Sequence, residues 1–313
     1  MGQGGVVAER PASSPHSEPK GPEQVLRLAA FADEPGGGNP AGVLLNAGHL
    51  TDADMQRIAT EVGYAETAFV VDPGDDANDR TVRLRYFSPD AEVPFCGHAT
   101  VVTAVALAER RGVGPFVIDT PVGRVSIETS RDTASAPDGP VTASFTSVEP
   151  ALRDLDSDVA DQLLSLLGLR RSDLDDSWPL REAYAGNWHP VVAVREQAVF
   201  DAFRFDPAGM RTLMDRQGWA GTVTVVCRQI SHGSGPTVVE ARNLFPVGDI
   251  TEDPATGSAA ASLGAYLREL QLLAPPARVI VHQGRHVGRP SLLLVDVPSH
   301  GGITVTGTAV PIV

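Results

Sequence analysis

Two segments of this sequence resemble each other although they lie about half a chain apart. Residues 94–100 (PFCGHAT) and residues 252–258 (EDPATGS) both end an extended segment and open an alanine-rich helix. In each segment a glycine is followed by a polar residue where the helix begins, at Gly97–His98 and at Gly257–Ser258. Similarity at this distance is what a duplicated unit leaves in a sequence. We therefore predict a duplicated unit, with one such helix in each half of the chain.

The two Gly-polar pairs also predict a ligand. The first N–H groups of a helix have no partner within it, and the helix dipole places positive charge at that end. Two helix N-termini that faced one cleft would together bind a small anion. We therefore expect an anion site formed by Gly97 and His98 on one side and by Gly257 and Ser258 on the other.

The composition is that of a globular protein and excludes several classes. A chain of 313 residues with 42% hydrophobic and 20% charged residues can form two domains with cores of their own. It has no apolar run long enough for a membrane span and no apparent signal peptide, so we expect a cytoplasmic protein without a membrane partner. The net charge of −14 argues against binding to nucleic acid. Two cysteines alone, Cys96 and Cys227, exclude a disulfide framework and a multi-cysteine zinc site.

The local pattern predicts many strands and few helices. Besides the two Gly-polar helices (the first over 98–111), we predict helices at 52–62, 159–167 and 208–217. Predicted strands are 26–31, 41–46, 67–71, 81–87, 116–119, 124–128, 141–148, 191–194, 222–229, 237–244, 278–281, 292–297 and 303–310. Many strands adjoin in sequence rather than alternating with helices, which favours an α+β fold with largely antiparallel sheets. Residues 154–156 are a plausible boundary, and 1–24 are expected to be a flexible tail.

Glu66 is the first candidate for chemistry. It stands where an apolar strand begins, and an acidic residue there is most often a solvated edge. In an apolar cleft, however, its pKa would be raised, and it could take up and return a proton near neutral pH. Tyr64 and Phe69 are among the neighbours that would supply such surroundings.

The residues at the starts of the two helices allow two interpretations each. Asp253 and Ser258 could simply cap their helix, or they could contact a ligand as well. His98 could be a cap or a buried structural residue, but its position opposite Ser258 in the repeat favours a functional role. His189 follows Trp188 at the start of a strand and could line the cleft. His282 and His286 are not expected to form a metal pair.

Cys96 lies beside a helix N-terminus, which would lower the pKa of its thiol and suit a nucleophile or proton carrier. A racemase with two thiols would need a second cysteine at the matching point of the repeat, and Pro254 stands there. Cys227 lies in an apolar strand and is expected in the core. No phosphate-binding, dinucleotide-binding or zinc-protease motif is present. We therefore expect neither a cofactor nor a metal.

Six segments in order resemble the PhzF-like isomerase family of phenazine biosynthesis. They are 38–43 (GNPAGV), 66–69 (ETAF), 87–89 (FSP), 96–100 (CGHAT), 252–258 (EDPATGS) and 288–291 (GRPS). The resemblance spans about residues 25–313. It implies the diaminopimelate epimerase fold, with two pseudo-symmetric domains that each wrap a curved sheet around a central helix. These domains would cover 25–150 and 151–300, with the active site between them and a strand at about 301–313 returning to the first.

The resemblance also implies roles. Glu66 matches the acid/base that moves a proton between two carbons, and His98, Asp253 and Ser258 match residues that hold and polarise the substrate. Gly97–His98 and Gly257–Ser258 match the amides that bind its carboxylate. Cys96 and Tyr64 are expected to line the same pocket. The best-known family reaction isomerises a dihydro-hydroxyanthranilate, uses no metal or organic cofactor, and is carried out by proteins that tend to be homodimers.

The leading hypothesis is thus a cofactor-independent isomerase of a small carboxylate, in phenazine-like or other antibiotic biosynthesis. An epimerase is an alternative, and it would need His98 or Asp253 as a second base. A hydrolase or lyase using Glu66 or Cys96 is another. A binder of small carboxylates without catalysis is the alternative from a different class.

Overall fold

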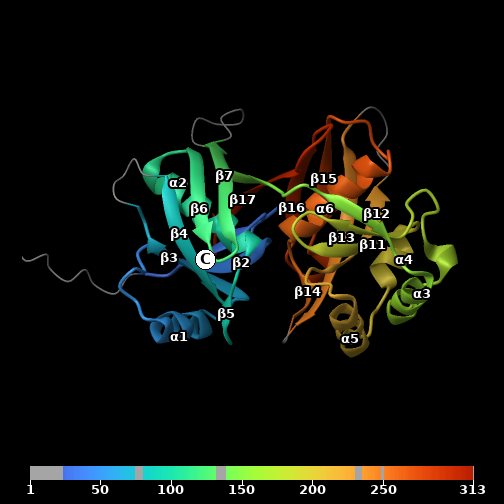
Figure 1. The fold of residues 1–313 in the computed structure, drawn as a ribbon, viewed down its shortest axis with the longest axis horizontal. Helices are drawn as coiled ribbons and strands as arrows, with labels where there is room; N and C mark the ends of the chain where they lie inside the picture. The colour runs from blue at the N-terminus through green and yellow to red at the C-terminus, as the bar shows by residue number, and fades with distance from the viewer. Residues whose placement is uncertain (1–23, 75–79, 132–138, 230–234, 248–249, 313) are drawn as a thin grey trace, which may run out of the picture.

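The computed structural model describes residues 24–74, 80–131, 139–229, 235–247 and 250–312. It is an α+β fold in which two halves lie side by side, each with one helix surrounded by strands (Figure 1). All but the last residue of the predicted tail, 1–24, lies outside the described residues. Among the described residues, no helix has both the length and the apolar character needed to span a membrane.

The N-terminal half is a ring of strands around helix α2. Its helices are α1 (Asp52–Val62) and α2 (Gly97–Arg111). Its strands are β1 (Leu26–Ala30), β2 (Asn39–Leu44), β3 (Glu66–Asp72), β4 (Thr81–Phe87), β5 (Glu92–Val93), β6 (Gly114–Thr120), β7 (Gly123–Arg131) and β8 (Val141–Thr146). Pairing runs β1–β2–β3–β4–β6–β7–β8. The last strand of the chain, β17 (Thr304–Pro311), pairs with both β1 and β8 and closes the ring.

The C-terminal half repeats this arrangement around helix α6. Its helices are α3 (Ser157–Leu166), η1 (Arg171–Asp173), α4 (Gln197–Ala202), α5 (Pro207–Gln217), α6 (Gly257–Glu269) and η2 (Arg285–Val287). Its strands are β9 (Ala151–Asp154), β10 (Arg181–Tyr184), β11 (Trp188–Val194), β12 (Val223–Gln229), β13 (Thr237–Val247), β14 (Ile250–Asp253), β15 (Ala277–Gln283) and β16 (Ser291–Val297). The parallel pairs β11–β12 and β13–β15 correspond to β2–β3 and β4–β6 of the first half. The repeat predicted from the Gly-polar pairs is therefore confirmed.

Both central helices are buried on every side. All residues of α2 from His98 to Ala108 are buried, and so are those of α6 from Ala259 to Arg268. A helix that is apolar all round belongs in a core, and small alanine side chains let strands approach it from all directions. At Gly264 a Cβ atom would lie 2.9 Å from side-chain atoms of Ile303 and Val295, so close packing there requires glycine.

The regular elements were predicted well, but short ones were missed. The predicted helix 52–62 and strand 81–87 coincide with α1 and β4. The strands β5, β9, β10 and β14 and the helix α4 were not predicted, because segments of two to six residues carry too few positions to show a period. The predicted boundary at 154–156 begins at the last residue of β9, after the chain has paired with β10 of the C-terminal half.

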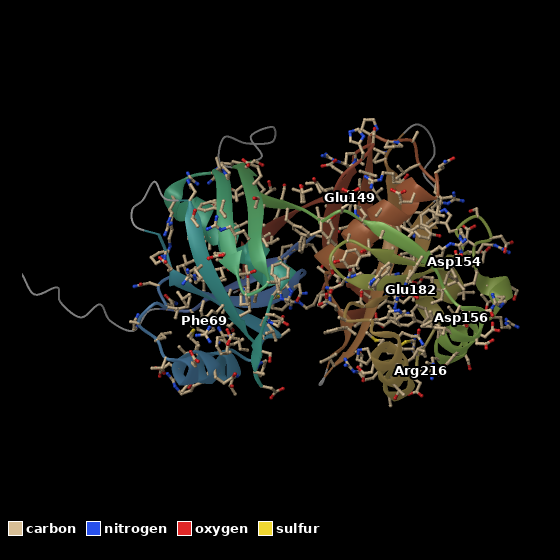
Figure 2. The ribbon with its side chains drawn as sticks, viewed as in Figure 1. Phe69, Glu149, Asp154, Asp156, Glu182 and Arg216 are labelled. Atoms are coloured by element: carbon tan, nitrogen blue, oxygen red, sulfur yellow. The ribbon has the colours of Figure 1, made fainter. Side chains whose placement is uncertain are left out.

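A buried carboxylate explains why the polar segment of β9 is a strand. Glu182 on β10 is only 4% exposed and accepts hydrogen bonds from the guanidinium of Arg153 on β9 (Nε at 2.9 Å) and from Trp219 Nε1 at 2.8 Å. The Arg153 guanidinium also lies 4.1 Å from the centroid of the Trp188 ring. Figure 2 labels Glu182 among the side chains of this half. A buried charge that is paired and hydrogen-bonded in this way holds the edge strand to its neighbour.

Phe31 joins the end of β1 to the strands of the C-terminal part of the chain. It is fully buried with φ at 61°, a conformation that residues other than glycine rarely adopt. Its N–H donates to the carbonyl of Thr308, and its carbonyl accepts from the N–H of Leu292, both at 2.8 Å. Its ring fills the space beside Gly307, where a Cβ atom would lie 2.0 Å from Phe31 Cδ1.

We predict that Gly307→Ala destabilises the fold. Because the Phe31 ring has no free space to move into, the added methyl group should lower the free energy of unfolding by about 1–3 kcal/mol. Denaturant unfolding, followed by circular dichroism, measures the change. Thr308→Ala on the same strand is the matched control, since it removes a methyl group and a hydroxyl that makes one long hydrogen bond (3.4 Å) to the Ala32 carbonyl. Equal unfolding midpoints for Gly307→Ala and the wild type would contradict this packing.

Candidate active site

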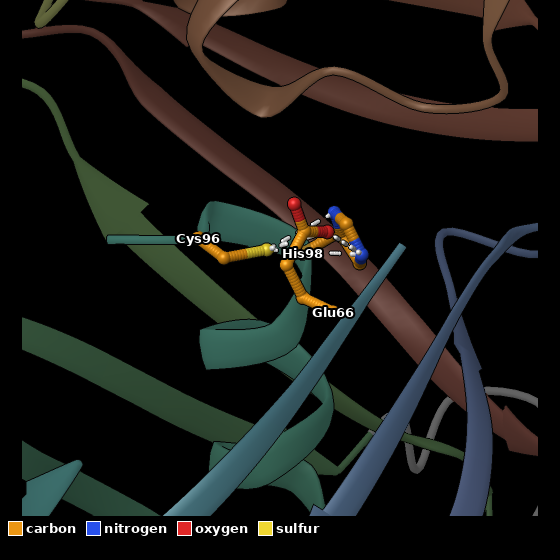
Figure 3. Close-up of side chains that lie close together, drawn as sticks. All are labelled: Glu66, Cys96 and His98. Carbon is orange, nitrogen blue, oxygen red and sulfur yellow. Dashed lines mark hydrogen bonds and ion pairs between the residues drawn. The ribbon is translucent and has the colours of Figure 1, made fainter. Parts of the chain in front are cut away.

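Three predicted site residues meet at the start of α2. Glu66 is the first residue of β3, Cys96 is the residue that precedes α2, and His98 is the second residue of α2. Glu66 Oε2 lies 3.5 Å from Cys96 Sγ and 3.4 Å from His98 Nε2, and Cys96 Sγ lies 3.4 Å from His98 Nδ1 (Figure 3). The structure thus brings together a carboxyl, a thiol and an imidazole that are up to 32 residues apart in sequence.

The interpretation of Glu66 as a solvated edge residue is wrong. Its side chain is 22% exposed, and burial raises its pKa to about 7. The negative charge of Asp253 raises this pKa further, while the hydrogen bond from the Cys96 thiol lowers it. A carboxyl with a pKa near 7 exists in both protonation states at neutral pH, which is the property required of a group that takes and returns a proton.

His98 and Cys96 are both uncharged at neutral pH. Burial lowers the pKa of His98 to about 4. Burial and the nearby Glu66 carboxylate raise the pKa of the Cys96 thiol well above its usual range. The prediction of a lowered thiol pKa was therefore wrong, because loss of water and a neighbouring negative charge outweigh the helix dipole here. The protonated thiol instead serves as a hydrogen-bond donor to Glu66.

The buried side chain of Asn39, at the start of β2, connects the two helix N-termini. Its Nδ2 donates to Asp253 Oδ1 at 2.7 Å and to the carbonyl of Ala255 at 3.0 Å, and it lies 3.3 Å from His98 Nδ1. Ala255 is two residues before α6, and His98 is in the first turn of α2. Both helices therefore begin within reach of one amide group, as the sequence predicted. Asn39 itself was missed, although it lies in the GNPAGV segment.

Asp253 is held from three directions. Its Oδ1 accepts from Asn39, its Oδ2 accepts from the Thr256 hydroxyl, and its backbone carbonyl accepts from Gln283 Nε2 at 2.7 Å. Burial raises its pKa to about 6, although the hydrogen bonds from Thr256 and Asn39 oppose the shift. The capping interpretation is wrong, because Thr256 precedes α6 and neither Asp253 nor Ser258 caps it. Gln283 was also missed, since it lies 30 residues further along the chain.

Ser258, the second residue of α6, has one partner in the C-terminal half. Its Oγ lies 3.1 Å from Nε2 of His189, which stands on β11 and is fully buried. Beside it, a Cβ atom at Gly257 would lie 2.8 Å from the Phe145 ring of β8, so the close approach of the two halves requires glycine there. At Gly97 the nearest side-chain atom would be 3.9 Å away, which leaves more room at the start of α2.

The remaining candidates lie elsewhere. The Tyr64 ring has the Arg27 guanidinium 5.2 Å from its centroid, and no hydrogen bond or ring contact among the described residues joins it to the cluster. Cys227 is buried in β12, as predicted for a core residue. His282 and His286 have separate acidic partners, Asp33 and Asp201.

Two clusters among the described residues have the types of side chain that bind metals. One is Glu66, Cys96 and His98; the other is Asp201, Glu240 and His286. In the second, the Arg285 guanidinium already pairs with both carboxylates. In the first, a metal would have to displace protons from a thiol and a carboxyl whose pKa values are both raised. Neither arrangement favours a metal ion.

Comparison with known proteins identifies the family of this chain. The sequence profile of the phenazine biosynthesis-like protein family matches residues 28–313. The uncharacterized isomerase YddE of Escherichia coli K12 is 32% identical over 298 residues, which cover 92% of this chain and 95% of that protein. The trans-2,3-dihydro-3-hydroxyanthranilate isomerase of Pseudomonas chlororaphis is 31% identical over 266 residues, which cover 85% of this chain and 87% of that protein.

A solved structure supports the same assignment. The phenazine biosynthesis protein of the PhzF family from Bacillus anthracis superposes with a TM-score of 0.76 at 27% identity, covering 92% of this chain and 96% of that one. The fold and the family that the six sequence segments predicted are both confirmed. The chain belongs to the phenazine biosynthesis-like protein family, and it is an isomerase of that family.

Proposed function

We propose that this isomerase needs no cofactor and moves a proton between two carbons of a small carboxylate, with Glu66 as the acid and base. The observation that carries the proposal is the environment of Glu66. Its partly buried carboxyl has a pKa of about 7 and lies beside two convergent helix N-termini. The site thus offers one group suited to proton transfer and a place for a negative charge next to it.

In the proposed reaction the Glu66 carboxylate removes a proton from an acidic C–H of the bound substrate. The electron pair of that bond moves into the conjugated system and toward the carboxylate. The protonated Glu66 then returns the proton to a different carbon, and the electron pair forms the new C–H bond. The first step converts the Glu66 carboxylate into the carboxylic acid, and the second step restores the carboxylate, so atoms and charge balance.

The helix N-termini would stabilise the charge that develops during this transfer. We propose that the amides of Gly97, His98, Gly257 and Ser258 bind the substrate carboxylate. N–H groups that are already oriented stabilise developing negative charge without reorganising. Because burial keeps His98 neutral, it would polarise the substrate through a hydrogen bond rather than a full charge.

We propose a small amino- or hydroxy-substituted unsaturated carboxylate as substrate. The Pseudomonas chlororaphis relative is named for a dihydro-hydroxyanthranilate, which has this chemistry. We propose a role in phenazine-like or other antibiotic biosynthesis, which the same similarity supports. The homodimer and the cytoplasmic location stay predictions.

The contacts in the site favour isomerisation over the alternatives. An epimerase would need a second base, but both carboxylate oxygens of Asp253 accept hydrogen bonds, and His98 is held between Asn39 and Cys96. A hydrolase that used Cys96 would need a thiolate, and the raised pKa of this thiol opposes it. Binding without catalysis remains as an outcome of the first test below.

We predict that Glu66→Gln abolishes proton transfer but preserves binding. Glutamine keeps the shape of the side chain and cannot take up the proton, so kcat should fall by about 100- to 10,000-fold. Proton NMR in D₂O, with a panel of unsaturated carboxylates that includes trans-2,3-dihydro-3-hydroxyanthranilate, measures deuterium incorporation and movement of the double bond.

Glu61→Gln provides the matched control, since Glu61 is an exposed residue of α1 whose ion partner is Arg57. It should exchange protons like the wild type. Exchange retained by Glu66→Gln would remove Glu66 from the mechanism. Binding of a carboxylate by the wild type without any exchange would favour the non-catalytic binder.

The pH dependence should report the ionisation of Glu66. The base must be ionised at the start, so kcat/KM should be low in acid, rise by about tenfold per pH unit, and level off above pH 7. Cys96→Ala removes a hydrogen bond that lowers the pKa of Glu66, so it should shift the rise to higher pH. Asp253→Asn removes a negative charge that raises this pKa, so it should shift the rise to lower pH. Shifts in the same direction for both variants would contradict the assignment.

Metal removal tests the proposed independence from cofactors. Dialysis against a chelator should leave the rate of proton exchange unchanged, within the error of the NMR assay, because the proposed chemistry uses side chains and backbone amides alone. A loss that Zn²⁺ or Mn²⁺ restores would assign a metal to the Glu66, Cys96 and His98 cluster instead.

A further inference from the structure

A buried hydrogen-bond network lies behind Ser258. His189 Nε2 contacts Ser258 Oγ at 3.1 Å, and the other ring nitrogen, Nδ1, faces Thr222. The Thr222 hydroxyl in turn donates to Asn243 Oδ1 at 2.7 Å, and Thr224 donates to the same oxygen at 2.8 Å. Apart from Ser258, which is half-buried, these residues are buried at 3% exposure or less. The proton transfer proposed above uses none of them except Ser258.

The position of the proton on His189 decides what Ser258 can do. Nδ1 lies 3.0 Å from both the N–H and the carbonyl of Thr222, and 3.1 Å from its hydroxyl. A proton on Nδ1 would point two hydrogens at each other and leave the buried Thr222 N–H without an acceptor. A buried carbonyl tolerates the lack of a partner better than a buried N–H does. We therefore assign Nδ1 as the acceptor, which places the proton on Nε2.

This assignment fixes the role of the serine hydroxyl. The Nε2–H of His189 donates to Ser258 Oγ, so the oxygen is occupied as an acceptor. The hydrogen of the hydroxyl then remains available to another acceptor at the start of α6. Burial lowers the pKa of His189 to about 4, so the ring is neutral and carries a single N–H at physiological pH.

The backbone keeps the imidazole in this place. At Gly221 a Cβ atom would lie 2.4 Å from Cε1 of His189 and 2.8 Å from each ring nitrogen. Only glycine at position 221 lets the ring pack this closely against the chain and reach both Thr222 and Ser258. The position of the His189 ring is therefore set by packing against Gly221 and by hydrogen bonds with Thr222 and Ser258.

We propose that His189 is a positioning residue that acts through Ser258. It holds the serine oxygen so that the hydroxyl donates its hydrogen to a carboxylate oxygen of the substrate. The identity of the acceptor rests on the proposed function, whereas the hydrogen bonds within the protein do not. His189 is thus assigned to substrate binding rather than to proton transfer.

A cycle of variants tests whether His189 acts through Ser258. The probes are trans-2,3-dihydro-3-hydroxyanthranilate and its stable aromatic counterpart 3-hydroxyanthranilate, with KM and Kd as readouts. Ser258→Ala should weaken binding by about 10- to 100-fold, since it removes a hydrogen bond to a charged group. His189→Leu should weaken it about 3- to 30-fold in the wild type and have no further effect in Ser258→Ala. His189→Gln, whose amide can donate in place of Nε2–H, should restore part of the affinity.

A merely structural histidine would give a different result. His189→Leu would then weaken binding equally in the wild type and in Ser258→Ala, and His189→Gln would not restore any affinity. Either outcome would overturn the proposal. Circular dichroism melting of each variant separates loss of folding from loss of binding. Gly221→Ala displaces the His189 ring without removing it, so it should also weaken binding, as His189→Leu does.

Nitrogen NMR of protein labelled at histidine tests the assignment without any ligand. His189 should remain neutral from pH 5.5 to 8 with its proton on Nε2, and Ser258→Ala should shift the Nε2 signal. A proton on Nδ1 would overturn the proposal even if the enzyme is active. Conversely, a wild type that binds no carboxylate and catalyses no proton exchange would refute the proposed function. The nitrogen NMR signals would still decide which nitrogen of His189 carries the proton.

Discussion

The arrangement of the site depends on one buried amide. Asn39 stands on a strand of the first half, yet its Nδ2 donates to Asp253 and to the carbonyl of Ala255 in the second half. The same nitrogen lies 3.3 Å from His98. In a buried setting each of these acceptors needs a donor, so the amide holds the starts of α2 and α6 together. Glu66 gains a carboxylate neighbour, Asp253, through this convergence.

Loss of water, more than formal charge, determines the chemistry of the cluster. The chain carries a net charge of −14, and the site itself contains two carboxyl groups and no arginine or lysine among the contacts described. Burial raises the pKa values of Glu66, Asp253 and Cys96 and lowers that of His98, so every member moves toward its neutral form. An anionic substrate would therefore meet backbone dipoles and hydrogen bonds rather than fixed positive charge.

Much of the candidate site was visible in the sequence because its residues lie in short segments with strong local signals. Glu66, His98, Asp253 and Ser258 were each selected from such segments. The errors concern properties that neighbours in space decide. The lowered thiol pKa expected for Cys96 ignored the Glu66 carboxylate, and the capping expected for Asp253 and Ser258 ignored their contacts with Asn39 and His189.

The sequence by itself determined most of the longer helices and strands, the duplication and the family. Periodicity places α1 and β4 at their observed bounds, because side chains within one helix or strand depend on spacing along the chain. Only the tertiary structure decided that Asn39 reaches Asp253 across 214 residues and that His189 contacts Ser258. These contacts join segments whose separation along the chain carries no periodic signal, so only the packing of the folded chain decides them.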